Sequence, residues 1–303
     1  MRPKIITIVA PTASGKTEMA IKLAKEYHGE IINADSRQIY CELNIGTAKP
    51  VGEWQIVDGV EAYFVDGVAH HLMDFISPDA DFSVADFKDL AEQKIEEILS
   101  RGKLPILVGG TGLYVSAITD NLDIPRVPAN KILREELEKL SLLDLQKRLK
   151  KIDPKTFTVI DQNNPRRLVR AVEVAETTGQ SFFAQQKKGI SKYDILALGI
   201  TVDREELYRR IDVRVDEQIK NGLVEEVINL AKKYSWELPS MSSIGYRQIG
   251  YFLRGEMSLP EAVEILKRDT RRYAKRQITW FKRDKNIKWV KGEGEVEVFF
   301  VAS

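Results

Sequence analysis

The sequence has a single cysteine, Cys41, among its 303 residues. One cysteine excludes an intramolecular disulfide framework and any zinc module that is built from several cysteines. The chain also lacks a run of about 18 apolar residues, the length that a membrane-spanning helix requires. Its N-terminal segment has no feature of an export signal. Together these absences predict a cytoplasmic protein that does not enter a membrane.

Charge is distributed unevenly along the chain, although the formal net charge is only +1. Residues 126–192 carry 15 Lys and Arg against 8 Asp and Glu, and residues 267–291 carry 11 against 2. Residues 1–125 are acidic, with 11 against 19. Two basic segments are typical of a protein that binds a polyanion, but exposed lysine-rich helices produce the same pattern. Charge alone therefore leaves both interpretations open.

Short apolar segments alternate with helical patterns through the first part of the chain. Segments 4–10, 30–34 and 104–108 are typical of buried strands, and segments 16–27 and 83–101 have helical spacing. Strands that alternate with helices favour a doubly wound parallel sheet. We therefore predict an α/β fold.

The pattern changes to helix after helix beyond Pro125, which predicts a helical insertion. Residues 193–201 are apolar enough to form a central strand that returns to the sheet, and helical patterns then resume. Residues 287–290 and 296–301 are weaker strand candidates. The predicted division is a core domain formed by residues 1–125 and 193–303, with the insertion at residues 126–192.

The segment Ala-Pro-Thr-Ala-Ser-Gly-Lys-Thr matches a phosphate-binding loop, except that alanine replaces the first glycine. It follows a predicted strand and opens a predicted helix, so its amides and the helix N-terminus can hold an anion. Lys16 can bridge the oxygens of that anion, and Thr17 is placed to ligate Mg²⁺. The candidate phosphate-binding residues are Ala10, Pro11, Thr12, Ala13, Ser14, Gly15, Lys16 and Thr17.

Two further motifs follow predicted strands. Asp35 ends the second strand, and Gly109-Gly110-Thr111-Gly112 follows the third. Because ligands collect at the carboxyl edge of an open parallel sheet, Asp35 can handle an acceptor nucleophile and Thr111 can present its hydroxyl there. The alternatives are that Asp35 caps a turn with Ser36, and that the glycine-rich segment is only a turn. Since no acidic pair ends the third strand, we do not expect hydrolysis of a nucleoside triphosphate.

Arginines are frequent in the helical segment that begins at Arg204. Arg210 and Arg214 share one face of this segment at i, i+4, where they can close over a leaving diphosphate. The alternative is that such arginines pair with nearby carboxylates, for example Glu206, at the surface. Both interpretations stay open from the sequence.

Taken in order, these motifs resemble the tRNA dimethylallyltransferase family, isopentenyltransferases that prenylate an adenosine beside the anticodon. The resemblance covers nearly the whole chain. It rests on the segments APTASGKT, INADSRQIY, IGTAKP, HHLMD, FSVADF, GKLPILVGGTGLY, PRRLVRAVEV, RRIDVRV, IGYRQ and TRRYAKRQITWF. It implies a P-loop NTPase-like doubly wound parallel sheet with a mainly helical insertion domain.

The resemblance also implies a reaction. A dimethylallyl group would pass from dimethylallyl diphosphate to the exocyclic N6 of the adenosine 3′-adjacent to the anticodon, releasing diphosphate. The phosphate loop would hold the diphosphate, with Mg²⁺ at Thr17. Asp35 would accept the proton of the amine, Thr111 would hydrogen-bond near it, and Arg210 and Arg214 would neutralise the departing diphosphate. We expect the chain to act as a monomer.

The partner implied by the resemblance is the anticodon stem-loop of tRNA. The implied tRNA-binding residues are Asp35, Ser36, Arg37, Gln38, Thr111, Arg134, Arg166, Arg167, Leu168, Val169, Arg170, Arg247, Arg272, Lys275 and Arg276. Three alternatives remain: an adenylate isopentenyltransferase that acts on free adenine nucleotides, a P-loop kinase of small molecules, and an RNA-binding protein without activity. The basic segments argue against the first, and Asp35 beside an intact loop argues against the last.

Overall fold

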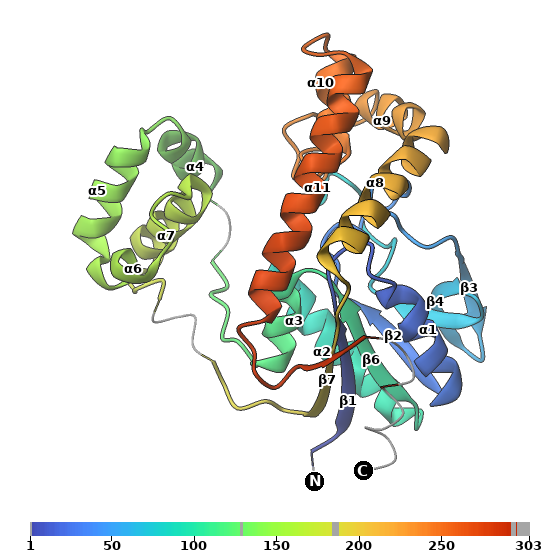
Figure 1. Ribbon diagram of the computed structural model, residues 1–303. Helices are drawn as coiled ribbons and strands as arrows, with labels where there is room; N and C mark the ends of the chain where they lie inside the picture. Colours follow the sequence, from blue (N-terminus) through green and yellow to red (C-terminus); the bar gives the residue numbers. More distant parts are fainter. Residues whose placement is uncertain (1, 128–129, 184–187, 292–294, 296–303) are drawn as a thin grey trace. The chain divides into compact units, whose positions relative to one another are not determined.

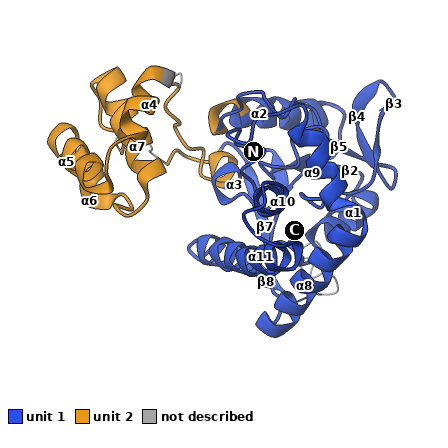
Figure 2. Ribbon diagram, turned by 90° about the horizontal axis from the view of Figure 1, so that it is seen from above, with its two compact units in different colours: residues 1–83, 87–115, 192–303 blue, residues 84–86, 116–191 orange. Residues whose placement is uncertain are grey.

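The computed structural model describes residues 2–127, 130–183, 188–291 and 295. Contacts divide the chain into two compact units (Figure 2). The first unit is formed by residues 1–83, 87–115 and 192–303, and the second by residues 84–86 and 116–191. The predicted insertion at residues 126–192 falls in the second unit except for its last residue, and that unit also takes in residues 116–125.

A mainly parallel sheet forms the centre of the first unit (Figure 1). Within the described residues its strand order is β3-β4-β5-β2-β6-β1-β7-β8. The strands are β1 Lys4–Val9, β2 Gly29–Asn33, β3 Glu53–Val57, β4 Val60–Val65, β5 Val68–His71, β6 Leu104–Gly109, β7 Asp194–Ile200 and β8 Lys288–Val290. The six strands from β5 to β8 in this order are parallel, which confirms the predicted doubly wound sheet. The strand candidate at residues 296–301 lies outside the described residues.

The helix that follows β1 packs one apolar face on this sheet. Its Met19, Ala20 and Leu23 are buried against Ile8 and Ile106 of the sheet. The helices of the first unit, two of which extend into the second, are α1 Lys16–Glu26, α2 Val84–Ser100, α3 Gly112–Thr119, α8 Arg204–Lys220, α9 Leu223–Ala231, α10 Tyr246–Leu253 and α11 Leu259–Phe281. None of the described helices is long and apolar enough to cross a membrane.

The long helices α8 and α11 lie side by side (Figure 1). Leu207 and Ile211 of α8 are buried with Ala274 of α11 and with Ala13 from the segment between β1 and α1. Residues far apart in the sequence are therefore packed around one loop. This packing determines which side chains of α8 and α11 can reach the edge of the sheet.

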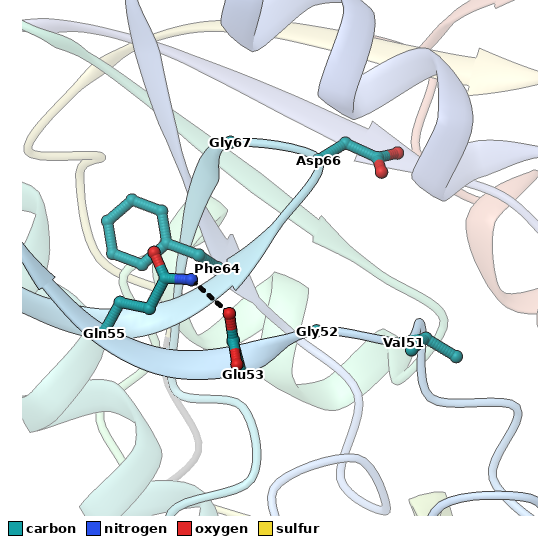
Figure 3. A pocket seen from close by; sticks show the side chains of 7 residues that line it. All are labelled: Val51, Gly52, Glu53, Gln55, Phe64, Asp66 and Gly67. Atoms are coloured by element: carbon teal, nitrogen blue, oxygen red, sulfur yellow. Dashed lines mark hydrogen bonds between the residues drawn. The ribbon is translucent and has the colours of Figure 1, made fainter.

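A β-hairpin at one edge of the sheet was not predicted from the sequence. Strands β3 and β4 pair antiparallel, and the two turn residues Asp58 and Gly59 both have positive φ, as a tight hairpin turn requires. All five residues of β3 are exposed, so the strand lacks the alternation of buried and exposed residues by which a strand can be predicted from the sequence. A cavity of about 400 Å³ lies beside the hairpin (Figure 3). It is lined by Val51, Gly52, Glu53, Gln55, Phe64, Asp66 and Gly67.

The second unit is a helical domain with its own core. Its helices are α4 Lys131–Glu138, α5 Leu142–Ile152, α6 Pro154–Val159 and α7 Pro165–Thr178. Asp153 and Asn164 cap two of them, each accepting a hydrogen bond from a backbone amide three residues further on. Leu137, Leu149 and Leu168 lie in the centre of this core.

A buried carboxylate links two parallel strands of the first unit. The Glu30 side chain on β2 is 2% exposed and lies 2.6 Å from Nε2 of His71 on β5. Arg101 and Lys103 contact the same carboxylate at 2.6 and 2.9 Å. Burial alone would raise the pKa of Glu30, but the contacts with His71, Lys103 and Arg101 outweigh it and lower the pKa to about 2.

We predict that Glu30→Gln destabilises the protein by roughly 2–3 kcal/mol at pH 7, because it leaves the surrounding cations without a counter-charge. Because the pKa of Glu30 is lower when folded, its charge stabilises the protein above about pH 4.5, and this contribution fades as the pH falls toward 2. Urea unfolding of both proteins between pH 7 and pH 3.5 should show the difference narrowing. A difference that stays constant with pH would contradict the prediction.

A matched control is Glu97→Gln. Glu97 pairs with Lys94 on the exposed side of α2. Surface ion pairs contribute little, so this variant should stay within about 0.5 kcal/mol of the wild type.

Candidate functional site

Three loops with predicted functional residues meet at one edge of the sheet in the first unit. Strands β2, β6 and β1 are neighbours and run parallel. Asp35 follows β2, Thr111 follows β6, and the phosphate loop follows β1. Because the carboxyl ends of parallel strands lie at the same edge, the fold brings these three segments together.

The phosphate loop has the conformation of an anion-binding segment. Ala13 and Gly15 both have positive φ, and Gly15 adopts the left-handed conformation directly before α1. A backbone that curls in this way can turn successive amides toward an anion at the helix N-terminus. The hydroxyl of Ser14 is buried and has no hydrogen-bond partner within the described part of the chain. Ala10, which replaces the usual glycine, is fully buried in the core.

Two cations lie close to this loop. The pKa of Lys16 is lowered, chiefly because the surrounding protein removes its ammonium group from water. The charge of Arg214 lowers this pKa further, whereas the carboxylate of Asp35 raises it. Arg214 reaches the loop from α8, where its Nη1 lies 3.4 Å from Oγ1 of Thr12. Burial also lowers the pKa of Arg214. Two neighbouring cations that are partly removed from water favour a bound anion.

The structure separates the two arginines that the sequence placed together. Arg210 is exposed, and its Nε donates to Glu206 at 2.7 Å. Glu206 also accepts hydrogen bonds from Arg209. Surface pairing, the alternative weighed from the sequence, therefore describes Arg210, whereas Arg214 faces the phosphate loop. A catalytic role of either residue stays a prediction.

The Asp35 and Thr111 segments are joined by hydrogen bonds. Oγ1 of Thr111 accepts from the backbone amide of Ser36 at 3.0 Å and donates to the Ser36 hydroxyl at 3.2 Å. Oδ1 of Asp35 accepts from the backbone amide of Arg37 at 2.9 Å. Asp35 therefore does cap a turn, as the alternative interpretation held, and it also lies beside Thr111. The Arg37 guanidinium donates to the carbonyl of Pro239.

Two site residues on α11 were not among the predicted ones. Tyr273 lies near Thr111, and the pKa of its hydroxyl is raised mainly by burial and further by the charge of Asp35. Gln277, one turn further on, contacts both the phosphate loop and the turn after β6. Their i, i+4 spacing places both side chains on one face of the helix. The same spacing is typical of residues that simply pack into the core, so the sequence did not identify them as site residues.

The side chain of Gln38 is oriented by a neighbouring loop. Its Nε2 donates to the carbonyls of Thr47 and Ala48, both at 3.2 Å. That loop is in turn fixed by Glu226, whose carboxylate accepts from the backbone amides of Ile45 and Gly46. The bonds made by Nε2 leave the amide oxygen of Gln38 as the atom that can accept from a ligand.

In the second unit, most predicted tRNA-binding residues lie on α7. Arg134 and Arg170 both hydrogen-bond the fully buried carboxylate of Glu173. Arg166 and Arg167 are exposed at the start of the helix. The two residues between them and Arg170 are buried in the core, so their side chains are not available to a partner; they are Leu168 and Val169.

The remaining predicted tRNA-binding residues belong to α10 and α11. Arg247 pairs with Asp269 at 3.3 Å, and Arg272 lies 3.9 Å from the same carboxylate. Lys275 and Arg276 are exposed, and the Arg276 guanidinium lies 5.7 Å from the ring centroid of Tyr273. These four basic residues stay candidates for contact with RNA phosphates.

The donor set at the phosphate loop suits a hydrated magnesium ion. The half-buried hydroxyl of Thr17 lies directly after Lys16, at the first turn of α1. The described residues contain no cluster of three His, Cys, Asp or Glu side chains that could hold a metal. Mg²⁺ prefers oxygen ligands and keeps several waters, and it is commonly bound through substrate phosphates rather than by a protein cage. The residues present therefore fit Mg²⁺ if it is bound jointly with a diphosphate.

Comparison with known proteins gives a consistent result over the whole chain. The family model described as IPP transferase matches residues 38–284, and the one described as isopentenyl transferase matches residues 3–70. The chain is 46% identical to a tRNA dimethylallyltransferase of Acetivibrio thermocellus over 94% of this chain and 91% of that one. It is also 46% identical to a tRNA dimethylallyltransferase of Alkaliphilus metalliredigens, over 95% and 92% of the two chains.

Solved structures agree with these sequence matches. A tRNA isopentenylpyrophosphate transferase of Bacillus halodurans is similar with a TM-score of 0.72 and 39% identity, over 99% of this chain and 96% of that one. A eukaryotic dimethylallyltransferase acting on tRNA gives a TM-score of 0.75 and 27% identity, over 95% and 74% of the chains. Both likenesses cover at least 95% of this chain.

We predict that inorganic diphosphate stabilises the protein, because it supplies the negative charge that Lys16 and Arg214 lack. At about 100 times its Kd, diphosphate should raise Tm by roughly 5 °C. Lys16→Met should weaken diphosphate binding more than about tenfold in calorimetry. Lys25→Met changes an exposed lysine in the last turn of the same helix and should bind diphosphate like the wild type. Equal affinity in the Lys16 variant would show that the loop is not the anion site.

Proposed function

The chain belongs to the IPP transferase family, and on that premise we propose that it transfers a dimethylallyl group from dimethylallyl diphosphate to tRNA. The acceptor is the exocyclic N6 of the adenosine 3′-adjacent to the anticodon. One observation carries the proposal: the anion-binding loop and the Asp35–Thr111 pair lie at the same edge of one sheet, close enough for Asp35 to influence the pKa of Lys16.

The donor diphosphate fits the phosphate loop. The curled backbone at Ala13 and Gly15, the buried Ser14 hydroxyl and the Lys16 ammonium form a set of hydrogen-bond donors. Arg214 adds a second charge from α8. These groups favour the diphosphate more as it departs, since negative charge builds up on the leaving oxygens during transfer.

A magnesium ion would be held by Thr17 and the oxygens of the diphosphate. It would supply Lewis-acid neutralisation of the leaving group, the same electrostatic task that Lys16 and Arg214 perform. The protein's own cations lower the cost of diphosphate departure in any case, because they are already positioned before the substrate arrives.

The reaction joins the adenine nitrogen to carbon C1 of the prenyl group. As the N6–C1 bond forms, the C1–O bond breaks and its electron pair leaves with diphosphate. The proton lost from N6 passes to the carboxylate of Asp35. Because the lone pair of an exocyclic amine is delocalised into the ring, a carboxylate that accepts its hydrogen bond raises the electron density on nitrogen. Thr111, which is hydrogen-bonded to Ser36, lies next to the Asp35 segment and can orient the amine.

An adenosine in an anticodon loop must leave its stack to reach such a site. Extrusion of a base costs a few kcal/mol and is cheapest in a single-stranded loop. The exposed arginines of α7 and α11 supply contacts with the RNA backbone that offset this cost. We expect one chain to suffice.

The two competing enzyme classes explain fewer of these features. An adenylate isopentenyltransferase shares the donor chemistry, but it does not need the basic helical unit. A P-loop kinase needs only the phosphate loop, and β6 ends at Gly109 and is followed by Gly110 rather than by an acidic pair. The relatives named tRNA dimethylallyltransferase match 94% and 95% of this chain, which includes the helical unit.

We predict that Asp35→Asn slows single-turnover prenylation by about 10²–10⁴, because the amide keeps the shape of the carboxylate but cannot take the proton. The Kd for tRNA, measured by filter binding on the same preparation, should change less than about tenfold. Near wild-type turnover in this variant would contradict the general-base role. An equal loss of rate and binding would make Asp35 a base-reading residue instead.

We also predict that tRNA binding depends steeply on salt. With about 5 phosphate contacts, the affinity should fall more than about tenfold between about 50 and 200 mM salt. Changing Arg166 and Arg167 together to alanine should reduce the slope of log K against log salt by roughly 2. Lys232→Ala changes an exposed lysine outside both basic segments and should leave the slope unchanged. An unchanged slope in the double variant would place the RNA elsewhere on the protein.

A further inference from the structure

The amide of Gln277 bridges two loops that belong to different substrates in the proposed reaction. Its Oε1 accepts from the backbone amide of Thr12 at 3.0 Å, and its Nε2 donates to the carbonyl of Gly110 at 2.8 Å. Thr12 lies in the phosphate loop, and Gly110 directly precedes Thr111. The Gln277 side chain is 5% exposed, so water does not compete for these bonds.

The bridge depends on a close approach at Gly110. A Cβ atom added there would lie 2.2 Å from Nε2 of Gln277, which no side chain could occupy without displacing the amide. Because Gly110 has no side chain, α11 can pack closely against the turn after β6. Strand pairing brings this turn and the phosphate loop together as far as Val9 and Gly109, and the Gln277 side chain joins them beyond the ends of the strands.

Neighbouring contacts hold the same helix face and the same loop. Tyr273, one turn before Gln277, lies near Thr111. Nη1 of Arg214 lies 3.4 Å from the side-chain hydroxyl of Thr12, the residue whose backbone amide Gln277 binds. Trp280 packs against Gly112, where an added Cβ would lie 2.3 Å from the indole ring. Gln277 therefore joins the phosphate loop to the turn after β6. Arg214 also contacts the phosphate loop, and Trp280 also packs against the turn.

We propose that Gln277 is a positioning residue that fixes the distance between the phosphate loop and the Asp35–Thr111 pair, and hence between the prenyl C1 and the attacking nitrogen. This inference rests on the proposed function. Each loop retains its own substrate contacts without Gln277. Its loss therefore affects the encounter of the two reacting atoms rather than the binding of either substrate, and a misplacement of about 1 Å can cost about 10²-fold in rate.

The test is Gln277→Met, which keeps the length and volume of the side chain and removes both hydrogen bonds. The single-turnover rate constant, measured at saturating donor with the enzyme in excess over tRNA and well above the Kd for tRNA, should fall about 10- to 100-fold. The Kd values for inorganic diphosphate and for tRNA should change less than about threefold. A misfolded fraction does not change this rate constant as long as the folded enzyme stays in excess over tRNA and well above the Kd, so partial unfolding would not mimic this result.

A matched control is Gln248→Met. Gln248 on α10 is another buried glutamine. It accepts from the backbone amide of Gly245, the residue before α10, and donates to the carboxylate of Asp269 on α11. Its variant loses two hydrogen bonds as well, and its rate constant should stay within about twofold of the wild type.

A second variant, Gln277→Glu, keeps the acceptor for Thr12 and loses the donor to Gly110 when ionised. Its rate constant should recover as the pH falls and the acid becomes a donor again, relative to the wild type at the same pH. An unchanged rate constant in Gln277→Met, or a loss confined to diphosphate affinity, would overturn the proposal. If the wild type transfers no prenyl group to tRNA, the proposed function fails instead, whatever these variants do.

Discussion

Parallel pairing of β2, β6 and β1 is the constraint on which the site depends. Because these three strands are neighbours with the same direction, the loops that follow them meet at one edge. The phosphate loop, Asp35 and Thr111 are far apart in the sequence, and only this register makes them one site. The C-terminal helices then add Arg214, Tyr273 and Gln277 above the same edge.

The electrostatics of the edge suit a reaction that releases an anion. Lys16 and Arg214 are both partly removed from water, and the charge of Arg214 adds to the effect of burial in lowering the pKa of Lys16. Two neighbouring cations in such surroundings are unfavourable until an anion binds between them. Asp35 brings a negative charge to the acceptor side of the same edge. The separation of a cationic donor side from an anionic acceptor side matches a transfer in which diphosphate leaves and a proton is taken up.

The sequence predicts the parts of the site that are local. The phosphate loop, the strand before it and the helix after it are encoded in consecutive residues, and Asp35 is recognisable because a buried strand ends there. Gln277 could not be predicted in its role, since its partner Thr12 lies 265 residues away and the contact arises from the packing of α11. Likewise Arg134 and Arg170 share the buried Glu173, a relation that no spacing reveals. The β3–β4 hairpin was missed because its outer strand is exposed on both faces.

The most direct test of the account supplies labelled dimethylallyl diphosphate and Mg²⁺ together with unmodified tRNA and an equal concentration of AMP, ADP and ATP. Mass spectrometry of the digested tRNA and of the free nucleotides then shows where the prenyl group has gone. We predict a gain of one dimethylallyl group on the adenosine 3′-adjacent to the anticodon, with one diphosphate released for each group transferred. Label in the free nucleotides, or consumption of ATP without prenylation of tRNA, would contradict it.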